Sequence, residues 1–324
     1  LKNPFNMVVL VSLIILFCLI IIPLLTMISS TFTLAQGELR RVQGHVGDFT
    51  LYYWKYILTG TMSSAVLWGP LKNSFICGFF TVLVSVPLGS VLAWLMIRTD
   101  IPGKKILGLL VTVPYMIPSW TKALAWLAMF RNSTSGADGF LAGMGIPIPD
   151  WLAYGPIAIV LCMSMHYYAF SYIMVSGALR SINSELEEMG EIQGASKAQI
   201  LRHITLPLIL PSVLSATVMT ISKSIGTYGV PANLGNRIGY YTLATKMRNF
   251  IDQGPQAVGY AMSIVLVLLA VLWGLIGRRL FAPYEMQTEP VDPSLHTASQ
   301  NEFWNGDWYG WWIIESGTGD YALS

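Results

Sequence analysis

The sequence predicts an all-α integral membrane protein with six membrane-spanning helices. Of the 324 residues, 54% are hydrophobic and only 11% are charged, whereas soluble domains carry roughly 25% charged residues. The apolar residues also gather in runs of twenty or more, which is the length that crosses about 30 Å of hydrocarbon at 1.5 Å per residue. This composition excludes a water-soluble globule.

Six apolar segments follow one another along the chain, and an even number places both termini on the same side of the membrane. They cover residues 7–29, 73–97, 106–130, 155–179, 207–227 and 257–277. The first is longer than the roughly 7–15 apolar residues of a signal peptide and is expected to be retained. The predicted membrane domain covers residues 1–281, and residues 282–324 form a linker and an aromatic-rich tail of unassigned role.

The distribution of basic residues predicts the orientation of these spans. Three basic residues occupy the short loop 98–105, and Arg278 and Arg279 follow the last span. Because short cytoplasmic loops are enriched in lysine and arginine, both regions are expected in the cytoplasm. Both termini and the loop 181–206 are then cytoplasmic as well.

The sequence argues against several other classes of protein. The net charge of +2 is not gathered into a basic block, so no nucleic-acid footprint is expected. Cys18, Cys77 and Cys162 show no metal-ligand or disulfide spacing and are expected to be packing or lipid-facing residues. The chain has no G-x-x-x-x-G-K-S/T motif to cradle ATP phosphates and no H-E-x-x-H or nucleophile elbow. Neither an enzyme site nor a cofactor on this chain is expected.

The most informative stretch is the loop 181–206, which is expected to form two short helices. Ser184 with Glu187 has the spacing of one capping box, and Ser196 with Gln199 has that of a second. Such boxes mark helix N-termini, because each side chain satisfies a free backbone N–H group. The loop should therefore fold as a helical hairpin.

Gly194 lies between the two expected helices and permits a sharp turn. Each helix carries an apolar face, made of Leu186, Met189 and Ile192 on the first and of Ile200, Leu201 and Ile204 on the second. Two amphipathic helices at a sharp angle form a knob that can dock on another protein. The alternative is a loop lying on lipid headgroups, but its four acidic residues would be repelled by anionic lipid.

The loop resembles a known signature. Glu188, Gly194, Ile204, Leu206 and Pro207 match, in register, the "EAA" signature of type I ABC importer permeases, which reads E-A-A, three residues, G, nine residues, I-x-L-P. The chain departs from the signature after the glutamate, where Met189 and Gly190 replace the two alanines. Glycine weakens a helix by about 1 kcal/mol relative to alanine, so the fit to a partner is expected to differ from that of other family members.

The resemblance implies a permease bundle whose cytoplasmic coupling helix docks into a groove on a separate ABC ATPase. It further implies two ATPase subunits that bind ATP and Mg²⁺, a second permease that is identical or homologous, and an extracytoplasmic solute-binding protein. The location it implies is the bacterial inner membrane. It assigns six residues to the coupling contact, which are Glu188, Gly194, Ala195, Leu186, Met189 and Pro207.

Two charged residues lie inside predicted spans, where charge is costly and often functional. Lys122 and Lys223 each follow the first residue of their span by sixteen positions, so both should lie roughly 24 Å from the inner surface. They either extend to the outer headgroups or line the outer end of a path and attract an anion. His166, near the middle of the fourth span, is either a packing residue or part of that path.

The stretch 226–235 follows the fifth span and contains several glycines and one proline. It is expected to turn at membrane depth, which requires shielding by protein or a cavity. It resembles the G-x-F-G-x-P-x-x-L-G stretch of permeases for ferric iron, polyamines and aminophosphonates, and Tyr228 and Pro231 are its candidate path residues. The two lysines favour an anion, such as an aminophosphonate or a ferric chelate, over a polyamine.

A rival interpretation is a secondary transporter or channel driven by an ion gradient. Such proteins contain inverted repeats with discontinuous helices in both halves. The proline-interrupted third span, 106–130, has no clear counterpart in the second half of this sequence. The sequence alone leaves open the substrate and the identity of the second permease.

Overall fold

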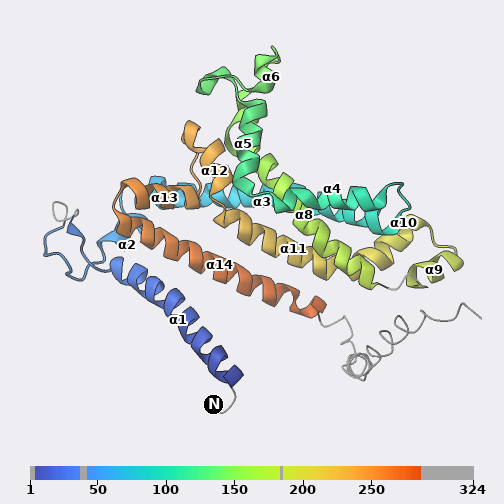
Figure 1. Ribbon diagram of the computed structural model, residues 1–324, viewed down its shortest axis with the longest axis horizontal. Helices are drawn as coiled ribbons and strands as arrows, with labels where there is room; N and C mark the ends of the chain where they lie inside the picture. The colour runs from blue at the N-terminus through green and yellow to red at the C-terminus, as the bar shows by residue number, and fades with distance from the viewer. Residues whose placement is uncertain (1–3, 37–41, 183–184, 286–324) are drawn as a thin grey trace, which may run out of the picture. The chain divides into compact units, whose positions relative to one another are not determined.

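The computed structural model describes residues 4–36, 42–182 and 185–285 (Figure 1). By its contacts the chain divides into a unit of residues 1–281 and a second unit of residues 282–324, and the account below concerns the first. The described residues form helices and connecting loops, apart from an isolated β-bridge between Thr33 and Phe49. The tryptophan-rich tail lies outside the described residues.

Five long helices form the framework: α1 (Pro4–Ser30), α3 (Gly69–Arg98), α8 (Gly155–Ser181), α11 (Leu206–Gly226) and α14 (Gln256–Glu285). The shorter helices between them are α2 (Tyr52–Leu58), α4 (Lys104–Met116), α5 (Ser119–Phe130), α6 (Phe140–Gly143), α7 (Asp150–Ala153), α9 (Glu185–Ile192), α10 (Lys197–Ile200), α12 (Gly229–Leu234) and α13 (Leu243–Gln253). Two π-helical turns, Ser64–Trp68 and Leu201–Thr205, lead into α3 and α11.

Five of the six predicted spans are confirmed as continuous helical stretches that are long and apolar enough to cross a membrane. Within the described residues these are Met7–Ser30, Ser64–Arg98, Gly155–Ser181, Lys197–Gly226 and Gln256–Gly277. The apolar side chains of the first stretch are largely exposed in the isolated chain, as expected of a helix surrounded by lipid.

The third predicted span, 106–130, is not one helix. Helix α4 ends at Met116, Ile117 and Pro118 adopt extended conformations, and α5 begins at Ser119. The physical reason is Pro118, whose ring clashes with a helical conformation at the preceding residue and which has no N–H group to continue the ladder. Pro114 lies inside α4 without interrupting it. The predicted span 106–130 is therefore made of two helices that meet at a break before Ser119.

The fifth span begins earlier than predicted, because the second helix of the loop continues into it. Helix α10 passes through the π-helical turn Leu201–Thr205 into α11, and the N–H group of Leu206 bonds to the carbonyl of Leu201. Pro207 is the second residue of α11 and directly follows the π-helical turn. Proline has no N–H group for the helical ladder, and a local π-helical adjustment of this kind accommodates a proline inside a continuous membrane helix. The second helix of the loop is thus continuous with α11.

Helices α3 and α8 pack closely along their lengths and form the centre of the bundle. Gly89 makes this approach possible, because a Cβ atom at that position would overlap the backbone of Tyr168 and Tyr172 and the side chain of Ser171. Small residues at a helix interface allow backbones to come close in a membrane, where dispersion contacts drive association. Alanine or a larger residue at Gly89 would force the two helices apart.

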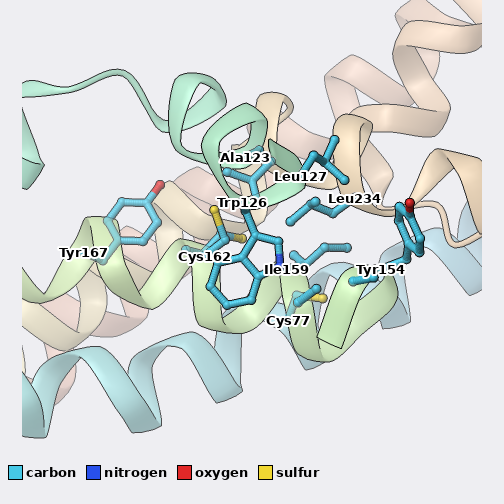
Figure 2. Close-up of a cluster of buried hydrophobic side chains, with 13 residues drawn as sticks. Cys77, Ala123, Trp126, Leu127, Tyr154, Ile159, Cys162, Tyr167 and Leu234 are labelled. Atoms are coloured by element: carbon cyan, nitrogen blue, oxygen red, sulfur yellow. The ribbon is translucent and has the colours of Figure 1, made fainter. Parts of the chain in front are cut away.

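A buried apolar cluster joins α5, α8 and α12 (Figure 2). Trp126 of α5 lies at its centre, and its indole Nε1 donates to the carbonyl of Leu152 at 2.9 Å. Cys77 and Cys162 are buried free thiols near this cluster, while Cys18 on α1 is an exposed free thiol. The predicted packing or lipid-facing role of the cysteines agrees with these positions.

The stretch after α11 turns as predicted and is shielded by protein. Helix α11 ends at Gly226, Thr227 is extended, and the chain re-enters as α12. Helix α12 packs beside α5 (Figure 1), and a Cβ atom at Gly229 would lie 2.6 Å from Cβ of Trp120. Glycine is therefore required there by the close approach to α5.

Candidate functional site

The loop 181–206 folds as the predicted helical hairpin. Gly194 adopts a φ of +83°, in the left-handed region that favours glycine, and turns the chain between α9 and α10. At the start of α10, the predicted capping box is present: Gln199 Oε1 accepts from the backbone N–H of Ser196 at 2.8 Å, and Ser196 Oγ accepts from that of Gln199. The other predicted box includes Ser184, which lies outside the described residues.

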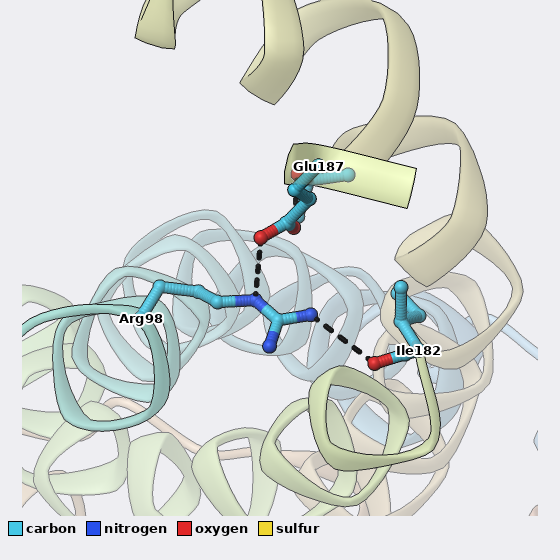
Figure 3. A network of polar contacts seen from close by, with 4 residues as sticks. Arg98, Ile182 and Glu187 are labelled. Atoms are coloured by element: carbon cyan, nitrogen blue, oxygen red, sulfur yellow. Dashed lines mark hydrogen bonds and ion pairs between the residues drawn. The ribbon is translucent and has the colours of Figure 1, made fainter. Parts of the chain in front are cut away.

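Glu187 ties the hairpin to the end of a membrane helix (Figure 3). Its Oε2 atom forms an ion pair with Arg98 Nε at 3.1 Å, and its Oε1 atom accepts a hydrogen bond from Thr205 Oγ1 at 2.8 Å. Arg98, the last residue of α3, also donates from Nη2 to the carbonyl of Ile182 at 3.5 Å. The Arg98 and Glu187 side chains are only 16% and 20% exposed. Glu187 thus joins α9 to the end of α3 and to the π-helical turn before α11.

Sequence reasoning missed this ion pair, although it assigned Arg98 and the 181–206 loop to the same side of the membrane. This shared side was the only feature of the sequence that pointed to a contact between Arg98 and the loop. It could not identify the partner, because the loop contains four acidic residues that were equally plausible. Only the fold of the hairpin places Glu187 beside Arg98.

Gly190, where the chain departs from the signature, lies at a contact between the two helices of the hairpin. A Cβ atom at Gly190 would lie 3.2 Å from both Cγ1 of Ile200 and Cδ1 of Ile204. Helix α9 thus lies directly against α10 and the π-helical turn. The apolar face predicted for the second helix is turned inward at Ile200, which is 7% exposed.

The apolar face predicted for the first helix points away from the hairpin. Leu186, Met189 and Ile192 are 48%, 56% and 85% exposed. Glu188 is exposed on the same helix and Ala195, just after the turn, is half-buried. Pro207, in contrast, is exposed on the membrane helix α11. In the isolated chain this face of α9 has no covering segment among the described residues, which fits a surface that docks on another protein.

A second candidate site lies where α4 breaks from α5. Lys122, in the first turn of α5, donates from Nζ to the carbonyl of Ile117 at 3.0 Å and contacts Nδ1 of His166. The carbonyl of Ile117, just past the end of α4, thus has an ammonium donor. Because an ammonium group has no lone pair, Nδ1 of His166 is the acceptor.

Lys223 reaches the same place from α11. Its Nζ atom donates to Tyr115 Oη at 3.4 Å and lies 4.8 Å from the centre of the Phe170 ring. The Tyr115 ring stacks on His166 and on Phe170, with centroids 5.4 and 5.9 Å apart. We call these five residues, Lys122, Lys223, His166, Tyr115 and Phe170, the lysine cluster.

The lysine cluster brings together three of the five predicted path residues. Neither Lys122 nor Lys223 forms an ion pair with a described residue. The other two are placed elsewhere: Tyr228 is exposed and Pro231 is buried, and no hydrogen bond or ring contact links either one to the lysines in the described part of the chain. Tyr115 and Phe170 were not predicted, because aromatic residues in apolar spans carry no distinguishing sequence signal.

A comparison with known protein families finds a match over more than half of the chain. Residues 85–283 match the model of the family described as "Binding-protein-dependent transport system inner membrane component". This match covers the lysine cluster, the helical hairpin, α11 and the last part of α3, which includes Arg98.

Several curated relatives are named for the transport of oxyanions. The sulfate transport system permease protein CysT of Salmonella typhimurium is 24% identical over 67% of this chain and 75% of its own length. The putative 2-aminoethylphosphonate transport system permease protein PhnV of the same organism is 28% identical over 69% of this chain and 77% of its own. A probable sulfate permease protein, cysT, of Marchantia polymorpha is 27% identical over 54% of this chain, and the match spans 59% of that relative.

Solved structures support the fold. A chain of a bacterial ABC transporter involved in the import of alginate superposes with a TM-score of 0.64 at 18% identity, covering 88% of this chain and 96% of that chain. A chain of the MetNI methionine ABC transporter, in an inward-facing conformation, has a TM-score of 0.51 at 22% identity over 68% and 94% of the respective chains.

Proposed function

This chain belongs to the family of binding-protein-dependent transport system inner membrane components, and we propose that it forms part of the translocation path of an ATP-driven importer for a small oxyanion. The observation that supports the substrate class is the lysine cluster, in which two ammonium groups converge without an acidic partner among the described residues. An oxyanion would supply the missing negative charge.

The names of the relatives favour the same class. Sulfate and 2-aminoethylphosphonate, for which CysT and PhnV are named, both present a tetrahedral group of negatively charged oxygens. Iron and polyamines, which the sequence resemblance also implied, gain no support from these relatives. A polyamine would be repelled by Lys122 and Lys223, and so would a bare ferric ion.

The energy for transport is proposed to come from two partner ATPases that bind ATP and Mg²⁺. This chain has no phosphate-binding loop of its own. The exposed face of α9 and the ion pair between Arg98 and Glu187 provide a contact and a rigid link into the membrane. A second permease would complete the path, and a binding protein would deliver the oxyanion to the side opposite the hairpin. Both chain termini would then lie in the cytoplasm.

The test is uptake by proteoliposomes that contain this permease assembled with its partner subunits and binding protein. Labelled sulfate and labelled 2-aminoethylphosphonate serve as substrates. We expect the double variant Lys122→Gln and Lys223→Gln to lower oxyanion uptake about tenfold or more, because charged clefts raise local substrate concentration by 10–10³. ATPase binding should be unchanged.

Lys246→Gln is the matched control. Lys246 also lies over an aromatic ring, 4.6 Å from the centre of Tyr241, but it belongs to α13 and not to the lysine cluster. Undiminished oxyanion uptake by the double variant would contradict the proposal. So would uptake of spermidine or ferric citrate with no uptake of either oxyanion.

A further inference from the structure

Helix α8 carries a stripe of residues that leads away from the lysine cluster. His166, Phe170, Ile173, Gly177 and Arg180 follow one another at spacings of four, three, four and three residues. In an α-helix this spacing places all five on one face. The stripe begins at the lysine cluster and ends at Arg180, one residue before the loop that carries α9. It therefore connects the cluster with the hairpin side of the bundle.

Helix α4 carries a matching stripe. Lys104, Gly108, Thr112 and Tyr115 are spaced four, four and three residues apart and share one face. The two stripes meet at the outer end, where the Tyr115 ring stacks on the rings of α8. At the other end both helices carry basic residues.

Between the inner parts of these stripes lies an open groove of about 770 Å³, which residues of α4, α8 and the end of α3 line. Gly108 and Gly177 keep the groove open in its middle. A Cβ atom at Gly177 would meet no other atom within 4 Å, and one at Gly108 would meet only the hydroxyl of Tyr172, at 3.6 Å.

Polar residues stand among the apolar residues of the groove wall. Thr112 of α4 and Ser176 of α8 both line it, and Thr112 Oγ1 donates to the carbonyl of Gly108 at 2.6 Å. Charged side chains also line it, and because burying an unpaired charge in an apolar medium is costly, they favour water over acyl chains in this groove.

Three basic residues, Lys104, Lys105 and Arg180, line the groove at its end on the hairpin side. None of them forms an ion pair within the described part of the chain. We call them the inner basic triad. The triad thus forms a cationic end of the groove. At its other end the lining stops at Thr112 of α4 and Tyr172 of α8, within one helical turn along the chain of Tyr115 and Phe170 of the lysine cluster.

We propose that this groove is the inner half of the translocation path, and that the inner basic triad is a second anion station from which the oxyanion leaves toward the cytoplasm. The inference rests on the proposed function and adds the route and its inner end. Two weak stations suit transport better than one strong site, because an ion must bind well enough to enter and weakly enough to leave.

The test is the labelling of an introduced cysteine in the assembled transporter. Gly177→Cys is made in a Cys18→Ser background, since Cys77 and Cys162 are buried. Two water-soluble methanethiosulfonates are compared, one carrying a sulfonate and one a trimethylammonium group, with each rate divided by that for free cysteine. Gly274→Cys on α14 is the matched control, because a Cβ atom there would also meet no neighbour within 4 Å.

We expect Gly177→Cys to react with both reagents, and with the anionic one about tenfold faster. Replacing all three residues of the triad with glutamine should abolish this preference while the thiol stays reactive. Gly274→Cys should react with neither reagent. A lipid-filled groove would leave Gly177→Cys unlabelled and overturn the proposal, as would labelling with no preference for the anionic reagent. Labelling needs no uptake, so a failure of oxyanion transport would instead count against the proposed function.

Discussion

At the scale of single residues, the most informative contact is the ion pair between Arg98 and Glu187. The two side chains are mostly buried where α3 ends and α9 begins. The pair also receives support from Thr205, which donates to the same carboxylate from the π-helical turn. One carboxylate therefore holds three segments in a fixed arrangement. If ATPases push on α9, this pair is the shortest route by which the push reaches α3.

Removal of one charge should loosen this link, and reversal of both should restore it. Glu187→Gln leaves the Arg98 guanidinium without its counter-charge, at a cost on the order of 1–3 kcal/mol. We expect faster hydrogen exchange in α9 and fewer substrate molecules transported per ATP hydrolysed, with ATPase binding retained. The double variant Arg98→Glu with Glu187→Arg should recover much of the coupling ratio. If Glu187→Gln alone kept the full ratio, the ion pair would have no mechanical role.

Gly190 shows the difference between a helix propensity and a packing contact. In the sequence it is a residue that weakens a helix, and in the structure it lies against Ile200 and Ile204. Sequence reasoning could say only that glycine lowers the helix propensity of α9. The tight approach of Ile200 and Ile204 depends on the path of the chain after Gly194, which no local pattern specifies. The exposed positions of α9 were predictable because helical periodicity alone groups them.

At the scale of elements, hydropathy located five spans as single helices, but it did not show that the third predicted span consists of two helices. Hydropathy reports how apolar a stretch is, and the stretch 106–130 is apolar throughout. It does not report whether neighbouring segments can satisfy the backbone groups that Pro118 frees. Here the side chain of Lys122 does so at Ile117. The sequence predicted that Lys122 and Lys223 lie at the same depth in the membrane, but it did not predict that they share one cluster. Their aromatic neighbours come from other helices, and the sequence does not show which way those helices face.

Restoring a continuous helix should therefore dismantle the lysine cluster. In a Pro118→Ala variant, α4 can extend into α5, and the carbonyl of Ile117 would accept a backbone N–H group in place of Lys122. We expect oxyanion uptake to fall several-fold, while the protein stays folded and assembled. Uptake measured beside a thermal-unfolding curve separates the two effects.

Pro87→Ala serves as the control, because Pro87 lies inside the unbroken helix α3. A Pro118→Ala variant that transports at the normal rate would show that the break between α4 and α5 is not needed for transport.

At the scale of the whole molecule, the two candidate sites lie on one mechanical unit. The hairpin is continuous with α11 through the π-helical turn, and Lys223 stands near the far end of that same helix. Glu187 ties the hairpin to α3, which packs along α8, the helix that carries His166. A displacement of α9 would therefore act on helices that hold the lysine cluster. The family match, which spans residues 85–283, contains this unit apart from the first part of α3.

Such a unit transmits force only if a partner protein binds the exposed face of α9. Met189 and Ile192 are more than half exposed, and burying such a side chain in a partner's groove contributes about 1.5–3 kcal/mol. We expect Met189→Glu to lower the amount of ATPase that co-purifies with the permease by about tenfold, because the new charge would have to be desolvated at the contact. Met189→Leu, which keeps an apolar side chain of similar volume, should bind normally.

A parallel measurement separates lost docking from lost folding. The labelling of Gly177→Cys reports on the membrane helices and should be the same in Met189→Glu as in its parent. If Met189→Glu retained full ATPase binding and coupled uptake, α9 would not be the surface that binds the ATPase. The lysine cluster and the groove would then need another source of movement.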